Sequence, residues 1–176
     1  MGSFSKNAAL LTLGFWLGCA IMFAAVVAPA LFNPDVASGL SRPMAGAISG
    51  AILRRIYVIT YACGGLAIFF LLIASFGELK GAKGPRRALI FCVLLIGLNA
   101  LNDLWIHDRI NKIRVSMANP DTGKAETLRE EFDRWHQVST WVYGCAVLFG
   151  ALAAISLLPG AAAGKSGGKT QGSKKK

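Results

Sequence analysis

Residues 56–76 read IYVITYACGGLAIFFLLIASF, an apolar run without a charged side chain. A spanning α-helix needs about 20 mostly apolar residues to cross the hydrocarbon core of a bilayer. Three further runs meet the same requirement, and polar segments separate all of them: residues 8–32, 88–106 and 138–158. The sequence therefore predicts an all-α protein, a four-helix transmembrane bundle, rather than a soluble domain.

The composition supports one membrane domain followed by a tail. The chain has 176 residues, of which 54% are apolar and 16% charged. We expect the domain over residues 1–159 and a disordered basic tail over residues 160–176. A secretory signal peptide is the alternative interpretation of the first run. The run is longer than the apolar region of such a peptide, and residues 1–7 are only weakly basic, so we expect an uncleaved first helix.

The formal net charge of +10 raises the question of a nucleic-acid partner. Much of the excess lies in the tail and in the loop after residue 76, positions that orient a membrane protein. With four spans both termini lie on one side, which holds ten Lys and Arg residues against nine on the other. This slight majority favours cytoplasmic termini. We expect the lipid bilayer and other membrane protein subunits as partners, and no nucleic acid.

The helices should be longer than the membrane requires. Pro43 suits the first turn of a second helix that ends at Phe76. A third helix beginning at Pro85 can continue to Met117, because the apolar side chains beyond residue 106 keep helical spacing. Residues 119–123 have turn composition, and the helix after them runs into the last span. The sequence therefore predicts that helices three and four extend into a protruding antiparallel hairpin over residues 107–137.

This hairpin should gather polar side chains near one membrane surface. His107 and His136 are about equally far from the turn, so we expect them at the same height. Asn99 and Asp103 precede His107 in steps of four residues, which puts the three on one helix face. Polar residues of helices two and four mark the same surface. The candidate residues for binding a ligand or partner are Arg54, Arg55, Asn99, Asp103, His107, His136, Ser139 and Tyr143.

Asp103 has two interpretations. An ionisable group inside a span is costly and usually faces a bundle interior or water, as in a proton or ion relay. Asp103 lies only about one turn from the surface, so a pairing with Arg54, Arg55 or a hydroxyl of helix four is the favoured interpretation.

The remaining chemistry-bearing residues do not predict an enzyme. The four cysteines fall one in each run, without the spacing of a metal site or a disulfide framework, and should pack between helices. Two histidines alone make a poor zinc site, although a haem or metal ligand role stays open. The chain shows no Ser/His/Asp arrangement and no HExxH motif. We therefore expect no catalytic residues, no metal and no cofactor.

Small residues and a proline should shape the helices. Gly14 with Gly18 and Gly46 with Gly50 are spaced for close helix approach, and we expect them to pack within the bundle rather than to form a dimer. Pro29 should kink or end the first helix.

Four short segments resemble a known family: residues 26–32 (VVAPALF), 46–57 (GAISGAILRRIY), 102–109 (NDLWIHDR) and 132–143 (FDRWHQVSTWVY). They are similar to the transmembrane protein 205-like family, small four-span membrane proteins with a domain of unknown function. The resemblance implies four spans and no established reaction. His107 and Asp108 stand where the family pattern has an acid and a proline, and Tyr143 replaces a frequent asparagine. Of the two histidines, only His136 matches the family pattern, so the resemblance implies no two-histidine site.

We expect a non-enzymatic integral membrane protein. It would act as an interaction or accessory subunit of a membrane complex, or bind a lipid headgroup through its polar interfacial cluster. The first alternative is a small transporter or ion-handling protein that uses Asp103 and His136 together with Asn99. The second is a haem- or metal-linked redox subunit.

Overall fold

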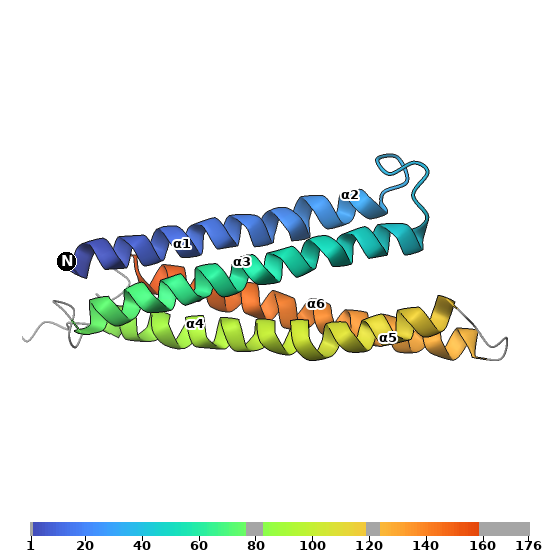
Figure 1. The fold of residues 1–176 in the computed structure, drawn as a ribbon. Coiled ribbons are helices and arrows are strands. Elements are labelled where there is room, and N and C mark those ends of the chain that lie inside the picture. Colours follow the sequence, from blue (N-terminus) through green and yellow to red (C-terminus); the bar gives the residue numbers. More distant parts are fainter. Residues whose placement is uncertain (1, 77–82, 119–123, 159–176) are drawn as a thin grey trace, which may run out of the picture.

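The computed structural model of the protein describes residues 2–76, 83–118 and 124–158 (Figure 1). Over these ranges the chain is helical apart from short connections and contains no strand. Four helical stretches are long and apolar enough to cross a membrane, which confirms the predicted fold class. They are Ser3–Phe32, Arg42–Phe76, Lys83–Met117 and Ala125–Ser156.

The first of these stretches comprises α1 (Gly2–Met22), the π-helical turn η1 (Phe23–Val27) and α2 (Ala28–Phe32). It lies antiparallel to α3 (Arg42–Phe76), along most of the length of that helix (Figure 1).

The third stretch comprises α4 (Lys83–Leu101), the π-helical turn η2 (Asn102–Ile106) and α5 (His107–Ala118), and it lies antiparallel to α6 (Ala125–Ser156) (Figure 1). The two helix pairs are close together at the end that holds the N-terminus and diverge toward the end that holds α5. The predicted hairpin is therefore present, while its turn over residues 119–123 and the basic tail over residues 160–176 lie outside the described residues.

The core lies in the half of the bundle nearer the N-terminus. All four long helices contribute, and most of the buried side chains are small, which lets the helices approach closely. The first buried cluster is Ala9, Leu13, Ala67, Leu71, Ala88, Cys92, Ala153 and Leu157. The second is Trp16, Ala20, Cys63 and Leu95.

Trp16 occupies the centre of this packing. Its ring is buried, and its Nε1 donates a hydrogen bond to Thr60 Oγ1 at 2.7 Å. The ring lies against Gly150 of α6, where even an added Cβ would overlap it. A glycine is required here because α1 and α6 meet through a large, rigid ring.

Pro29 neither ends the first helix nor interrupts its course sharply. A proline has no N–H to donate and crowds the preceding turn. The π-helical turn η1 precedes it, with the Ala28 N–H donating to the carbonyl of Phe23, and α2 then continues to Phe32. The local widening accommodates the proline, as π-turns commonly do within α-helices.

The prediction that Gly14 and Gly18 pack within the bundle is wrong. An added Cβ at either glycine would meet nothing within 4 Å, and both lie on the exposed side of α1. Sequence spacing identifies a small-residue face but does not say which direction that face takes in the bundle.

We expect Gly150→Ala to lower the melting temperature in detergent, because Trp16 and Leu95 leave no room for a methyl group. Overpacking of this kind costs about 1–3 kcal/mol. Gly144→Ala on the same helix is the matched control, since Gly144 is exposed and has nothing within 4 Å. Equal melting temperatures for the two variants would contradict this packing.

Candidate functional site

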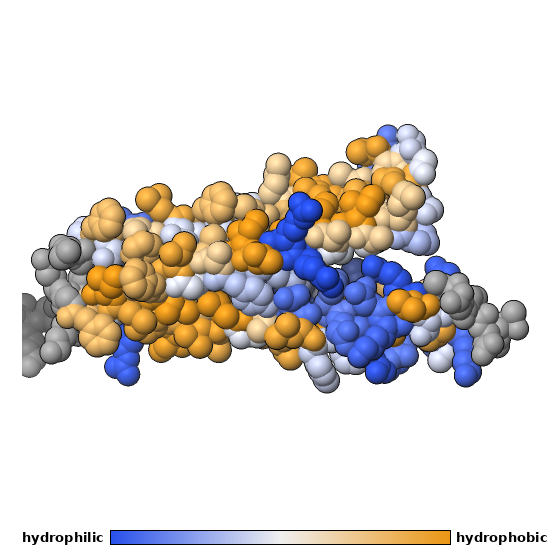
Figure 2. All heavy atoms as spheres, viewed as in Figure 1, coloured by the Kyte–Doolittle hydropathy of each residue, from blue (hydrophilic) through white to orange (hydrophobic). Residues whose placement is uncertain are grey.

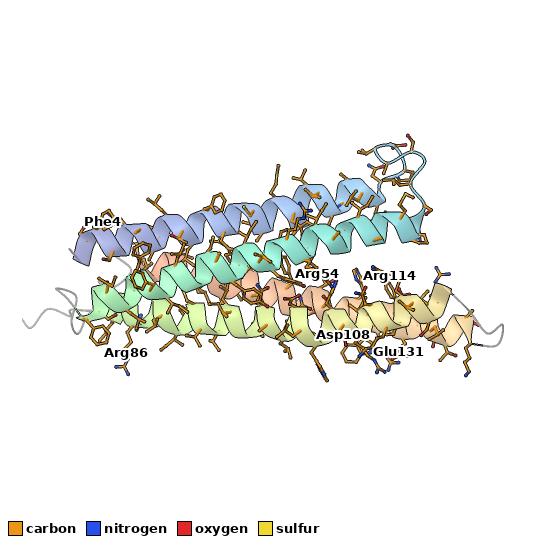
Figure 3. All side chains as sticks on the ribbon, in the orientation of Figure 1. Phe4, Arg54, Arg86, Asp108, Arg114 and Glu131 are labelled. Atoms are coloured by element: carbon orange, nitrogen blue, oxygen red, sulfur yellow. The ribbon has the colours of Figure 1, made fainter. Side chains whose placement is uncertain are left out.

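A cleft of about 460 Å³ opens where α3 and α5 diverge. We call it the basic cleft. Its α3 wall and its α5 wall face each other across the space between the two ribbons, and Figure 3 shows Arg54 and Arg114 in this region. The lining residues are Ala47, Gly50, Ala51, Arg54, Arg55 and Val58 of α3, and His107, Asn111 and Arg114 of α5.

The positive charge of the basic cleft has no internal counterion. Three of the lining residues are arginines and none is acidic. Within the described ranges, no carboxylate lies at ion-pair distance from Arg54, Arg55 or Arg114. The cleft therefore offers guanidinium groups that are free to bind an anion.

The nearby acids are engaged elsewhere. Asp108 pairs with Lys112 at 2.7 Å, and Glu131 pairs with Arg109 at 2.8 Å. Both pairs lie on the exposed surface of the hairpin, so neither neutralises the lining of the cleft.

Arg114 is held by an aromatic ring and by two glycines. Its guanidinium carbon lies 5.9 Å from the ring centroid of Phe132, a cation–π arrangement. On the other side, an added Cβ at Gly46 or at Gly50 would lie 3.7 Å from a guanidinium nitrogen of Arg114. These glycines thus face the hairpin as expected, but they accommodate a charged side chain and His107 rather than a closely packed apolar one.

The basic cleft lies at the level where the apolar spans end. The uncharged run of α3 begins at residue 56, directly after Arg54 and Arg55, and the third apolar run ends at residue 106, the last residue of η2, directly before His107. Val58 extends the lining toward the apolar part of α3 and is exposed. Figure 2 shows hydrophilic surface gathered around this region and hydrophobic surface over much of the remaining described bundle.

A second group of polar side chains is buried between the helices, one to two turns inside the span. Ser139 Oγ donates to Asn102 Oδ1 at 2.8 Å, and Asn102 Nδ2 donates to the Ser139 carbonyl at 3.2 Å. Asn102 is fully buried, and Ser139 nearly so. This reciprocal pair connects η2 to α6 and satisfies polar groups that would be costly inside a membrane.

Asp103 has a different partner from the ones predicted. Its Oδ2 accepts a hydrogen bond from the Tyr61 hydroxyl at 3.1 Å, so it bonds to neither arginine nor to a hydroxyl of α6. Tyr61 lies on α3, and the bond connects that helix to η2.

The two histidines occupy different environments. His107 lines the basic cleft and meets the Tyr57 ring edge-on, with the centroids 6.5 Å apart. His136 is exposed and stacks on Phe132 of its own helix, with the centroids 5.9 Å apart. The structure therefore does not bring the two rings together, although they lie near the same end of the bundle.

Two other predicted site residues serve the packing of the bundle. Tyr143 donates a hydrogen bond to the Ala20 carbonyl at 3.3 Å and so connects α6 to α1. Asn99 is buried, and among the described residues its Nδ2 has no hydrogen-bond partner. The eight predicted residues thus divide between the cleft, the bundle interior and the exposed hairpin.

Asn99, Asp103 and His107, predicted to share one helix face, do not share one environment. Asn99 is buried, whereas Asp103 and His107 are half-buried, and the next buried residue after Asn99 is Asn102. Asn102 follows Asn99 by three residues, a spacing that also keeps two side chains on one helix face. From Asn102 onward the helix widens in η2, where the His107 N–H donates to the Asn102 carbonyl, five residues back.

Sequence reasoning missed Asn102, Asn111 and Arg114. A signal for Arg114 was available, because it follows His107 by two helical turns and therefore shares its face. Asn102 also had a signal, because it follows Asn99 by three residues and therefore lies near its face.

Within the described part of the chain, no three His, Cys, Asp or Glu side chains are grouped so that they could hold a metal ion. The four cysteines are free thiols. Cys63 and Cys92 are buried as expected, whereas Cys145 is exposed and does not pack between helices.

Four membrane-length helices with an apolar exterior define a multi-pass membrane protein. A family model described as a domain of unknown function (DUF4149) matches residues 11–119, more than half of the chain. The chain belongs to this family. The matched region contains every lining residue of the basic cleft and ends before α6. No curated protein and no solved structure matches the chain.

We expect Ser139→Ala to lower the melting temperature in detergent, because Asn102 Oδ1 would lose its donor in a buried site. Hydrogen bonds between membrane helices contribute about 0.6 kcal/mol on average and up to about 1.7 kcal/mol. The control is Thr140→Ala, since Thr140 is exposed and bonds only to the His136 carbonyl of its own helix. An unchanged melting temperature for Ser139→Ala would contradict a stabilising role of the pair.

Proposed function

We propose that this protein is a non-enzymatic membrane protein that binds the phosphate of an anionic lipid headgroup in the basic cleft. The observation that carries the proposal is the set of three arginines that have no carboxylate partner among the described residues and that gather in one cleft at the end of the apolar spans.

The chemistry of arginine favours a phosphate ligand. A guanidinium group is planar and remains charged, and its fork of donors matches two oxygens of a phosphate. Arg54 and Arg55 approach from α3 and Arg114 from α5, so both walls of the cleft present donors to a bound headgroup. Unpaired arginines in a concave site are available for such a ligand without breaking an existing ion pair.

The location favours a lipid over a soluble anion. The cleft lies at the height where the spans meet the headgroup region, and its lining passes from Arg54 to Val58 in one helical turn. A phosphate held by the arginines would leave the attached acyl chain beside the apolar surface of α3. A cleft lining that is cationic at one end and apolar at the other fits an amphipathic ligand.

The other predicted functions have less support from the geometry. The transport alternative relies on Asn99, Asp103 and His136, which lie in three different environments. Membership of a larger membrane complex stays a prediction that co-purification in mild detergent tests. The closer resemblance to the transmembrane protein 205-like family likewise stays a prediction.

We expect the double variant Arg54→Gln/Arg55→Gln to bind anionic lipid at least about tenfold more weakly, since charged hydrogen bonds contribute more than about 1.4 kcal/mol. The measurement is the apparent dissociation constant for phosphatidylglycerol in phosphatidylcholine nanodiscs.

The matched control is Arg86→Gln/Arg87→Gln, which removes two adjacent exposed arginines near the start of α4, at the other end of the bundle. It should bind as the native protein does. If the two double variants lose the same affinity, the attraction is a general charge effect and the cleft is not the site.

Filling the cleft should have the same effect as removing its charge. Gly50→Leu would place a side chain against Arg114 and His107, and we expect weaker lipid binding with the fold retained. Gly65→Leu on the same helix is the control, because Gly65 is exposed and has nothing within 4 Å. Unaltered binding by Gly50→Leu, measured in the same nanodiscs, would place the lipid elsewhere.

A further inference from the structure

We propose that the basic cleft selects lipids that carry two phosphate groups over lipids that carry one. This inference rests on the proposed function and deepens it, because it assigns separate phosphates to the inner and the outer part of the same cleft.

The arginines of the cleft lie at two heights along the bundle. Arg114 has its guanidinium beside Gly46 and Gly50. These glycines precede Arg54 by eight and four residues, which is about 12 and 6 Å along a helix that rises 1.5 Å per residue. Figure 3 shows Arg114 farther toward the α5 end of the hairpin than Arg54. Arg54 and Arg55 therefore form an inner cationic position near the span, and Arg114 forms an outer one.

The Arg114 side chain at the outer position is held in place by its neighbours. Phe132 covers one side of the Arg114 guanidinium, and the two glycines leave room on the other. An arginine held in this way loses less side-chain freedom when it binds, which favours affinity. Among the described residues, no carboxylate lies at ion-pair distance from Arg114.

The charge of the cleft determines which ligand fits best. A single phosphodiester carries one negative charge. It would bind at the inner or the outer position and leave the other position without a counterion. A lipid with two phosphates can supply an anion at each height, and Coulomb attraction is stronger beside an apolar span than in bulk water. The preference for two phosphates over one thus depends on Arg114, whereas the binding of either lipid depends on Arg54 and Arg55.

The test uses two lipids that differ in the number of phosphates. The full-length protein in phosphatidylcholine nanodiscs is titrated with phosphatidylinositol 4-phosphate, which has a second phosphate farther from its acyl chains, or with phosphatidylglycerol, which has one phosphate, at equal total phosphate. We expect the native protein to bind the two-phosphate lipid at least about tenfold more tightly, a difference of about 1.4 kcal/mol. Arg114→Gln should lose this preference and keep its affinity for phosphatidylglycerol, while Arg54→Gln should weaken the binding of both lipids.

The control variant is Lys112→Gln, which removes one positive charge from the same helix at a residue that pairs with Asp108 and does not line the cleft. It should retain the preference. Melting temperatures of all variants report whether each is folded.

Each of the following results would overturn the inference. If Arg114→Gln weakens the binding of both lipids equally, or leaves the preference intact, Arg114 is not the selective residue. If sodium pyrophosphate displaces phosphatidylinositol 4-phosphate as effectively as that lipid itself does, the ligand is a soluble diphosphate. If the native protein binds phosphatidylglycerol and phosphatidylinositol 4-phosphate equally, the proposed function stands and the selectivity fails; if it binds neither, both fail.

Discussion

The bundle depends on a mismatch between helix length and membrane thickness. The hydrocarbon core of a bilayer is about 30 Å thick, whereas a helix of 35 residues is about 52 Å long. Both Arg42–Phe76 and Lys83–Met117 have this length. The apolar half of each helix packs with the others, and the remainder extends beyond the span. There the two helix pairs diverge, and the polar ends of α3 and α5 form the walls of the basic cleft.

Polar groups within the span are mostly paired, and each pair joins two helices. Trp16 bonds to Thr60 between α1 and α3, Tyr61 bonds to Asp103 between α3 and η2, and Asn102 bonds to Ser139 between η2 and α6. Neighbouring residues carry these pairs, since Thr60 precedes Tyr61 and Asn102 precedes Asp103. The unpaired arginines just beyond them are thus a separate feature, since the interior does not need them for its own hydrogen bonding.

The sequence predicts the helices better than it predicts their faces. Length and apolar composition are local properties, so the four spans, the start of α3 near Pro43 and the long hairpin follow from them. The neighbours of a side chain depend on how the helices are arranged. Spacing places both Asn102 and Asp103 within about one turn of Asn99, and it does not show that Asn102 is buried while Asp103 bonds to Tyr61 of α3.

The candidate site was predicted in part for the same reason. Arg54, Arg55 and His107 were placed at the interface by their positions at the ends of apolar runs, and all three line the cleft. His136 shares their height but is exposed on α6. The divergence of α3 from α5, which creates the cleft, is a property of the whole bundle and has no local sequence signal.

The depth of the helices in the bilayer tests this account most directly. Spin labels can be placed one at a time, in a cysteine-free background, at the exposed residues Val93, Leu104 and Val115 along α4, η2 and α5. Their relative accessibility to oxygen and to a water-soluble nickel complex in nanodiscs reports depth. The account predicts a deep label at residue 93, a shallow one at 104 and a water-exposed one at 115. A label at residue 115 that lies in the hydrocarbon core would place the cleft inside the membrane and contradict the account.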